Sequence, residues 1–134
     1  MNKIEHIGIA VKSIEKSNTL FASLFGEEHY KIEEVASEGV KTSFFKTGPN
    51  KIELLEATKP DSPIAKFIEK KGEGIHHIAF AVDNIESEIK RLQNEGFTVL
   101  NEVPKKGADN KLVAFLHPKT TNGVLIELCQ DIKS

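Results

Sequence analysis

The sequence predicts an α+β fold built from two tandem βαβββ units. Residues 4–11 alternate bulky and small side chains, and residues 75–82 repeat this pattern 71 positions later, with His6 and His77 at matching places. Period-two alternation is typical of a β-strand. Each of these strands is followed by a segment with helical spacing and then by three short strand-like segments. The duplicated order therefore predicts two halves built on one plan.

The first half takes up residues 1–58. A helix is expected between Ser13, which can cap its start, and Gly26, which can end it. Strands are expected at residues 29–35, 40–46 and 51–56, with a turn at Gly48-Pro49-Asn50 before the last of them. Residues 59–73 then form a linking helix, whose start is indicated by Asp61-Ser62-Pro63.

The second half takes up residues 74–134. Asp83 and Glu86 have the spacing of a capping box, and Gly96 marks the expected end of the helix that follows. Strands are expected near residues 98–103, 112–117 and 124–129, and Asn122-Gly123 is a strong turn signal before the last strand. We interpret the two halves and the linking helix as one domain of residues 1–134.

Composition excludes several classes of protein. The 134 residues include 18 basic and 20 acidic side chains, a formal net charge of −2, with lysines scattered along the chain, so nucleic acid is not an expected partner. No apolar run approaches the roughly 20 residues that span a bilayer, and no signal-peptide pattern is present. The single cysteine, Cys129, excludes an internal disulfide and fits a buried position in a cytoplasmic protein.

The duplication also predicts partners for the two histidines. Glu53 lies in the apolar segment of residues 51–55, and Glu127 lies in the matching segment of residues 125–129. A buried carboxylate is costly unless it is paired, protonated or bound to metal. One strand histidine or glutamate is more often a structural or surface residue, but four at repeat-equivalent positions favour a shared site. His6, Glu53, His77 and Glu127 suit a divalent ion with open positions for water or substrate.

The remaining candidates for chemistry are weaker. His76 should point to the opposite, helix-facing side of its strand. His117 ends a strand and is either an exposed loop residue or a substrate contact, while His29, Glu56 and Asp61 are expected in water. No Gly-x-Ser-x-Gly nucleophile elbow and no phosphate-cradling glycine loop occurs.

Several stretches of the sequence together resemble a known family, the methylmalonyl-CoA epimerases. This family belongs to the vicinal oxygen chelate superfamily, which also includes glyoxalase I and extradiol dioxygenases. The resemblance covers nearly the whole chain. It is carried by residues 4–11, 52–55, 61–67, 74–78, 115–119 (Phe-Leu-His-Pro-Lys) and 123–128 (Gly-Val-Leu-Ile-Glu-Leu). The last two stretches are the most specific.

The resemblance implies an open, cup-shaped mixed sheet with helices outside, in a homodimer. It implies that His6, Glu53, His77 and Glu127 bind one divalent ion per chain, for which cobalt, zinc, nickel and manganese all tolerate the ligand set. The implied reaction inverts the α-carbon of an acyl-CoA substrate, methylmalonyl-CoA, through a metal-stabilised enolate. Lys105, Lys106 and Lys119 are candidate contacts for the coenzyme A tail, and His117 for the substrate.

Inversion needs two acid–base groups, one on each face of the carbon, or one mobile group. We expect Glu127 to serve as both ligand and base, with Glu53 or a metal-held water on the opposite face. Some family members carry a carboxylate at the position of Thr42, which cannot act as a general base near neutral pH. Glyoxalase I is the alternative, since it uses the same ligand types and enolate chemistry. A drug-binding member without catalysis is a further alternative, although such proteins need no metal quartet.

Overall fold

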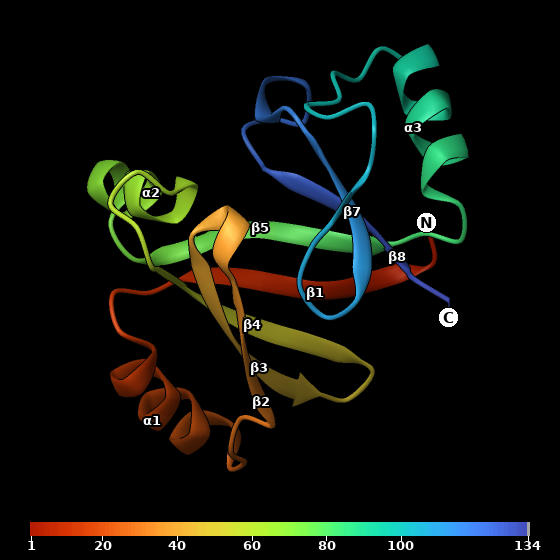
Figure 1. The fold of residues 1–134 in the computed structure, drawn as a ribbon. Helices are drawn as coiled ribbons and strands as arrows, with labels where there is room; N and C mark the ends of the chain where they lie inside the picture. Colours follow the sequence, from red (N-terminus) through yellow and green to blue (C-terminus); the bar gives the residue numbers. More distant parts are fainter. Residues whose placement is uncertain (134) are drawn as a thin grey trace. The chain divides into compact units, whose positions relative to one another are not determined.

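The computed structural model describes residues 1–133, and its elements follow the predicted order (Figure 1). These are β1 (Lys3–Ala10), α1 (Ile14–Phe25), β2 (Lys31–Val35), η1 (Ala36–Glu38), β3 (Val40–Thr47), β4 (Asn50–Ala57), α2 (Pro63–Lys71), β5 (Gly74–Ala81), α3 (Ile85–Asn94), β6 (Lys105–Lys106), β7 (Lys111–Leu116), η2 (Pro118–Thr120) and β8 (Ile126–Asp131). The predicted α+β class with two βαβββ repeats is confirmed.

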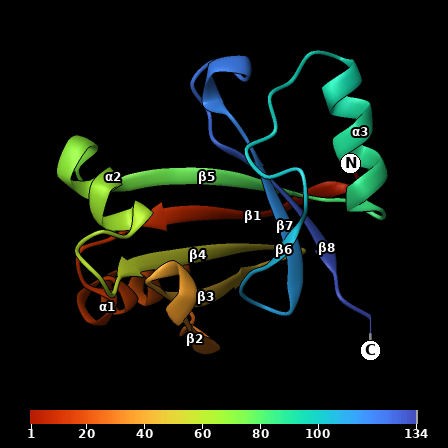
Figure 2. The ribbon, with the colours of Figure 1, turned by 45° about the horizontal axis from the view of Figure 1, so that its top comes forward.

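The chain divides into two compact units. The first comprises residues 6–76, and the second combines residues 1–5 with the residues from 77 onward. In the first unit β2 pairs antiparallel with β3, β3 pairs antiparallel with β4, and β4 pairs parallel with β1. Figure 2 shows these strands running side by side. The parallel partners β1 and β4 are separated along the chain by α1, β2 and β3, because parallel strands cannot be joined by a short hairpin turn.

The predicted caps set the ends of the helices in the first unit. Ser13 accepts a hydrogen bond from the Lys16 backbone N–H at 3.2 Å and begins α1, which ends at Gly26 with φ of 72°. Ser62 caps α2 in the same way through Ala65, with Pro63 in the first turn. A left-handed residue ends a helix at least cost when it is glycine, because glycine has no Cβ.

The bulky face of β1 and the apolar face of α1 form the main core of the first unit. Val11, Ile14, Phe45 and Leu54 are buried there, and Phe21 and Phe25 pack against them. The start of α1 is fixed by Glu56 of β4, whose carboxylate accepts a hydrogen bond from the Ile14 N–H at 2.6 Å. The expectation that Glu56 is a surface charge is therefore wrong, because its carboxylate satisfies an orphan donor of the helix.

The second unit repeats this arrangement. β5 pairs parallel with β8, and β7 pairs antiparallel with both β8 and the short β6. Its core is formed by α3 and the strands behind it, with Ile85, Ile89, Leu92, Leu116 and Leu128 buried together. Cys129 is 1% exposed, as predicted for a small apolar side chain.

The start of α3 differs from the predicted capping box. Asn84, not Asp83, is the N-cap, and its side chain accepts a hydrogen bond from the Ser87 N–H at 3.1 Å. Asp83 instead accepts a hydrogen bond from the Asn2 side-chain amide at 2.8 Å. Asparagine and aspartate cap helices about equally well. The long-range contact of Asp83 with Asn2 therefore decides that Asn84 caps α3.

The strand expected near residues 98–103 is also largely absent, since only Val99 forms an isolated bridge, to Leu116. The side chain of Asn101 takes the place of a regular strand there. Its amide nitrogen donates to the Val113 carbonyl at 3.2 Å, and its oxygen accepts from the Phe115 N–H at 3.0 Å. A side chain that pairs with the backbone in this way competes with ladder hydrogen bonds.

Among residues 1–133, no helix is both long and apolar enough to cross a membrane.

Candidate active site

The first unit brings His6 and Glu53 together. Glu53 on β4 lies opposite Gly8 of β1, two residues after His6, and its carboxylate oxygen lies 3.1 Å from His6 Nδ1. Both residues are buried, at 4% and 5% exposed. Gly8 has no side chain to fill the space beside Glu53, so the small-residue face of β1 leaves room for the two polar groups.

The second unit brings His77 and Glu127 together by the same strand register. Glu127 on β8 lies opposite Ala79 of β5, again two residues after the histidine, and its carboxylate lies 3.1 Å from His77 Nε2. Both side chains are buried. Phe115 of β7 lies opposite Glu127, and its ring meets the His77 ring edge to face, with centroids 5.9 Å apart.

Each pair offers an imidazole nitrogen and a carboxylate oxygen in a buried position. A buried carboxylate needs a positive charge, a hydrogen-bond donor or a metal ion beside it. A histidine that is protonated on both ring nitrogens supplies a positive charge and a hydrogen-bond donor. The same two donor types are those that borderline divalent ions prefer. The chemistry of the side chains therefore fits a metal, and each unit supplies two of the four predicted ligands.

His76 follows the prediction made for it. Its ring packs edge to face against Phe67 of α2, with centroids 5.0 Å apart. Adjacent residues of a strand point to opposite faces, so His76 contacts the helix and His77 points to the other face. His76 is therefore a natural control for His77.

The predicted substrate contacts belong to the second unit. His117 caps η2, because its Nδ1 accepts a hydrogen bond from the Lys119 backbone N–H at 3.0 Å. This bond leaves the proton of the neutral imidazole on Nε2. Lys105 is exposed on β6, where its register partner is Val113. Substrate binding by His117, Lys119 and Lys105 stays a prediction.

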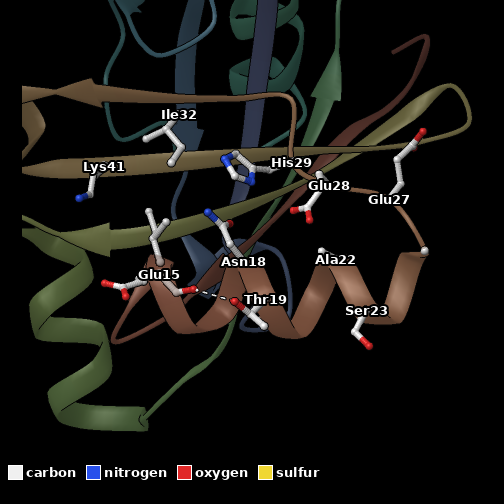
Figure 3. A pocket seen from close by; sticks show the side chains of 12 residues that line it. Glu15, Asn18, Thr19, Ala22, Ser23, Glu27, Glu28, His29, Ile32 and Lys41 are labelled. Atoms are coloured by element: carbon white, nitrogen blue, oxygen red, sulfur yellow. Dashed lines mark hydrogen bonds between the residues drawn. The ribbon is translucent and has the colours of Figure 1, made fainter.

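The first unit also contains a cavity of about 760 Å³ between α1 and the strands that it covers (Figure 3). Neither His6 nor Glu53 lines it. The ring of His29 does, and it packs against Phe45 with its Nδ1 buried and without a hydrogen bond. His29 was expected in water, but its side chain is half-buried, because its ring packs against Phe45.

Thr42 occupies the position at which the sequence lacks a carboxylate. It is 1% exposed on β3, opposite Leu55 on one side and Glu33 of β2 on the other.

The fold and the paired side chains agree with a comparison against known families. A model of the Glyoxalase/Bleomycin resistance protein/Dioxygenase superfamily matches residues 5–115. The chain belongs to this superfamily.

The relatives within the superfamily include methylmalonyl-CoA epimerases, in agreement with the predicted resemblance. The ethylmalonyl-CoA/methylmalonyl-CoA epimerase of Cereibacter sphaeroides is 39% identical over 132 residues, which cover 97% of this chain and 98% of that protein. An uncharacterised Bacillus subtilis protein, YqjC, is also 39% identical, over 97% of this chain and 93% of its own length. The solved methylmalonyl-CoA epimerase of Streptomyces coelicolor, in complex with 2-nitronate-propionyl-CoA, superposes with a TM-score of 0.94. It is 32% identical, and the match covers 100% of this chain and 99% of that chain.

Proposed function

We propose that this protein is a methylmalonyl-CoA epimerase, which inverts the carbon between the thioester and the free carboxylate of its substrate. The observation that carries the proposal is the buried histidine–glutamate pair that recurs in each half at the same strand register. Epimerases that match the chain over nearly its whole length support the choice of substrate. A coenzyme A thioester is therefore the proposed small-molecule ligand.

The proposed cofactor is one divalent metal ion per chain, held by His6, Glu53, His77 and Glu127. The donor chemistry described above supports this set, and cobalt, zinc, nickel or manganese would satisfy it. When bound, the ion would act as a Lewis acid toward the negative charge that develops on the thioester oxygen. The imidazoles must be neutral at the nitrogen that binds, so metal uptake releases a proton from any charged histidine.

Glu127 and Glu53 are the proposed acid–base groups. One carboxylate takes the α-proton, and the electron pair of the broken C–H bond moves toward the thioester oxygen. The second group starts as the carboxylic acid, gives its proton to the opposite face of the same carbon and is left as a carboxylate, so one proton is taken up, one is released and the configuration is inverted. The buried Thr42 hydroxyl cannot supply the second base near neutral pH.

Proton exchange in deuterated water tests this function. Purified protein should exchange the α-proton of methylmalonyl-CoA for deuterium, and the Glu127→Gln variant should lose at least about 100-fold in rate. Exchange confined to the methylglyoxal–glutathione hemithioacetal would instead identify a glyoxalase. A Glu127→Gln variant that keeps its metal and the full rate would exclude Glu127 as the base.

We also propose that the protein is a cytoplasmic homodimer, as the family resemblance implies. Light scattering coupled to gel filtration tests the assembly, with a mass of one chain as the contradicting result.

A further inference from the structure

The cavity beside α1 lies on the other face of the sheet from the histidine–glutamate pair of the first unit. Neither His6 nor Glu53 lines it. Ser43 of β3 contacts α1, whereas its neighbour Phe44 lies opposite Glu53 on the other face. The volume of about 760 Å³ is in the range of pockets that hold small organic molecules. The proposed epimerase reaction uses none of the side chains that line this cavity.

Asn18 of α1 presents a hydrogen-bond donor to this cavity. It is 9% exposed, and its side-chain oxygen accepts a hydrogen bond from the Ser43 hydroxyl at 2.5 Å, which fixes the orientation of the amide. Figure 3 shows the amide nitrogen on the side of the cavity where the ring of His29 lies. No described residue accepts a hydrogen bond from this nitrogen. A largely buried amide needs an acceptor, and here the acceptor must come from the cavity.

His29 supplies a second donor. Its Nδ1 is buried and has no hydrogen-bond partner among residues 1–133, while its ring lines the cavity and packs against Phe45. A buried N–H without an acceptor is rarer in proteins than a buried lone pair, so the neutral ring carries its proton on Nε2. Because Nδ1 is buried, Nε2 is the nitrogen that a ligand can reach, and it donates.

The charges that line the cavity narrow the choice of ligand. Three carboxylates, those of Glu15, Glu27 and Glu28, face one cation, Lys41. A simple anion would accept from the two N–H donors but would meet this excess of negative charge. A simple amine would pair with a carboxylate but would leave the amide of Asn18 without an acceptor. An α-amino acid carries both groups on one carbon and satisfies both conditions.

We propose that this cavity binds an aliphatic α-amino acid. The carboxylate of the ligand accepts from Asn18 Nδ2 and His29 Nε2, and its ammonium pairs with Glu28, whose carboxylate points toward α1 in Figure 3. Ile14 and Ile32 offer apolar surface to the side chain of the ligand. This binding site goes beyond the proposed epimerase function and does not depend on it.

Glu27 is the matched control for Glu28. Both residues are exposed, both line the cavity and both carry the same charge. Figure 3 shows that the carboxylate of Glu27 points away from α1, in contrast to that of Glu28. Replacing either residue by glutamine changes the net charge equally, so only a direct contact with the ligand separates the two variants.

Calorimetric titration with L-valine, L-leucine and L-isoleucine tests the proposal without any substrate present. At least one of them should bind with a dissociation constant in the millimolar range or below. Glu28→Gln should weaken this binding by about tenfold, the scale of a hydrogen bond to a charged group, and Glu27→Gln should leave it nearly unchanged. His29→Phe keeps the ring contact with Phe45 and removes the donor, so it should also weaken binding by about tenfold.

Two fragments of valine test the need for both charged groups. 3-Methylbutanoate lacks the ammonium, and 2-methylpropylamine lacks the carboxylate. Each should bind at least about tenfold more weakly than valine, because each loses a charge-assisted hydrogen bond. In the nuclear magnetic resonance spectrum of the unmodified protein, valine should shift the side-chain amide signals of Asn18.

The absence of binding by all three amino acids at millimolar concentration would overturn the proposal. Equal weakening by Glu27→Gln and Glu28→Gln would also overturn it, because the general field of the protein would then explain the binding. Unchanged Asn18 signals would place the amino acid elsewhere on the protein. Coenzyme A that displaces valine would assign the cavity to the tail of the thioester instead. None of these results bears on proton exchange, so the proposed epimerase function stands or falls separately.

Discussion

The two halves of the molecule agree in the parts that hold the histidine–glutamate pairs and differ at their edges. In both halves the glutamate lies opposite a glycine or alanine two residues after the histidine, and opposite a phenylalanine on its other side. At the edge, β2 has five residues, whereas β6 has two and is preceded by the irregular segment around Asn101. The duplication has kept the register that positions the pairs and has left the outer strands to vary.

The pairs themselves differ in one detail. His6 faces its glutamate with Nδ1, and His77 faces its glutamate with Nε2. The two glutamates therefore meet different nitrogens of their histidines, and Phe115 packs against the ring of His77. The halves are alike in strand register but not in the orientation of the imidazole.

The largest expected effect tests whether both halves serve one metal. His6→Ala and His77→Ala should each weaken metal binding by at least about 100-fold, because each removes a proposed ligand. Competition with a chelator measures this affinity. His76→Ala is the control and should keep the metal, since its ring contacts Phe67. If only one of these two variants loses metal affinity, the metal belongs to one half, and the two halves do not serve one ion.

A smaller effect is expected at the helix starts. The Ile14 N–H donates to the Glu56 carboxylate at 2.6 Å, and the Ile85 N–H donates to the Gln130 side-chain oxygen at 2.7 Å. A charged acceptor is the stronger one, so Glu56→Ala should lower the free energy of unfolding by about 2 kcal/mol and Gln130→Ala by about 1 kcal/mol.

Urea denaturation measures both values. Glu56→Gln gives the first half the acceptor of the second, and it should bring the loss to about 1 kcal/mol or less. Equal losses for Glu56→Ala and Gln130→Ala would show that charge contributes nothing to this contact.

The smallest effect concerns a surface contact found only in the second unit. Glu88 accepts a hydrogen bond from Arg91 and lies 3.4 Å from the N-terminal amine of Met1. The Arg91 hydrogen bond holds the pKa of the Glu88 carboxyl below its ordinary value. A lowered pKa stabilises the fold at pH values above the ordinary pKa, and this contribution is lost as the pH falls through the lowered pKa.

Glu88→Gln should therefore cost about 0.5 kcal/mol at neutral pH, the scale of an exposed ion pair, and nothing in strong acid. Thermal unfolding across the acid range measures this. A cost that stays constant with pH would assign the effect to packing.

The sequence predicted the paired site well because period-two alternation states which face of a strand each side chain takes. His6 and His77 fell on the small-residue faces, and each glutamate lies opposite the residue two positions after its histidine. The structure joins each histidine to the glutamate of its own half. How the four act together remains the proposal tested by the alanine variants.

Features that depend on long-range contacts escaped the sequence. Asp83 gave a plausible cap, but Asn2, 81 positions away, binds its side chain. Asn101 gave no local sign that it would pair with the backbone of β7. Local periodicity does not encode such partners.

The division of β1 between the two units has a consequence for the order of folding. Residues 6–76 form one unit whose contacts are all available as soon as that stretch has been synthesised. The Asn2 N–H, by contrast, donates to the Ala81 carbonyl at 2.8 Å, and Met1 reaches Glu88. Residues 1–5 can therefore find these partners only after the whole first unit has been synthesised, and the contact between Asn2 and Ala81 closes a stretch of chain that contains that unit.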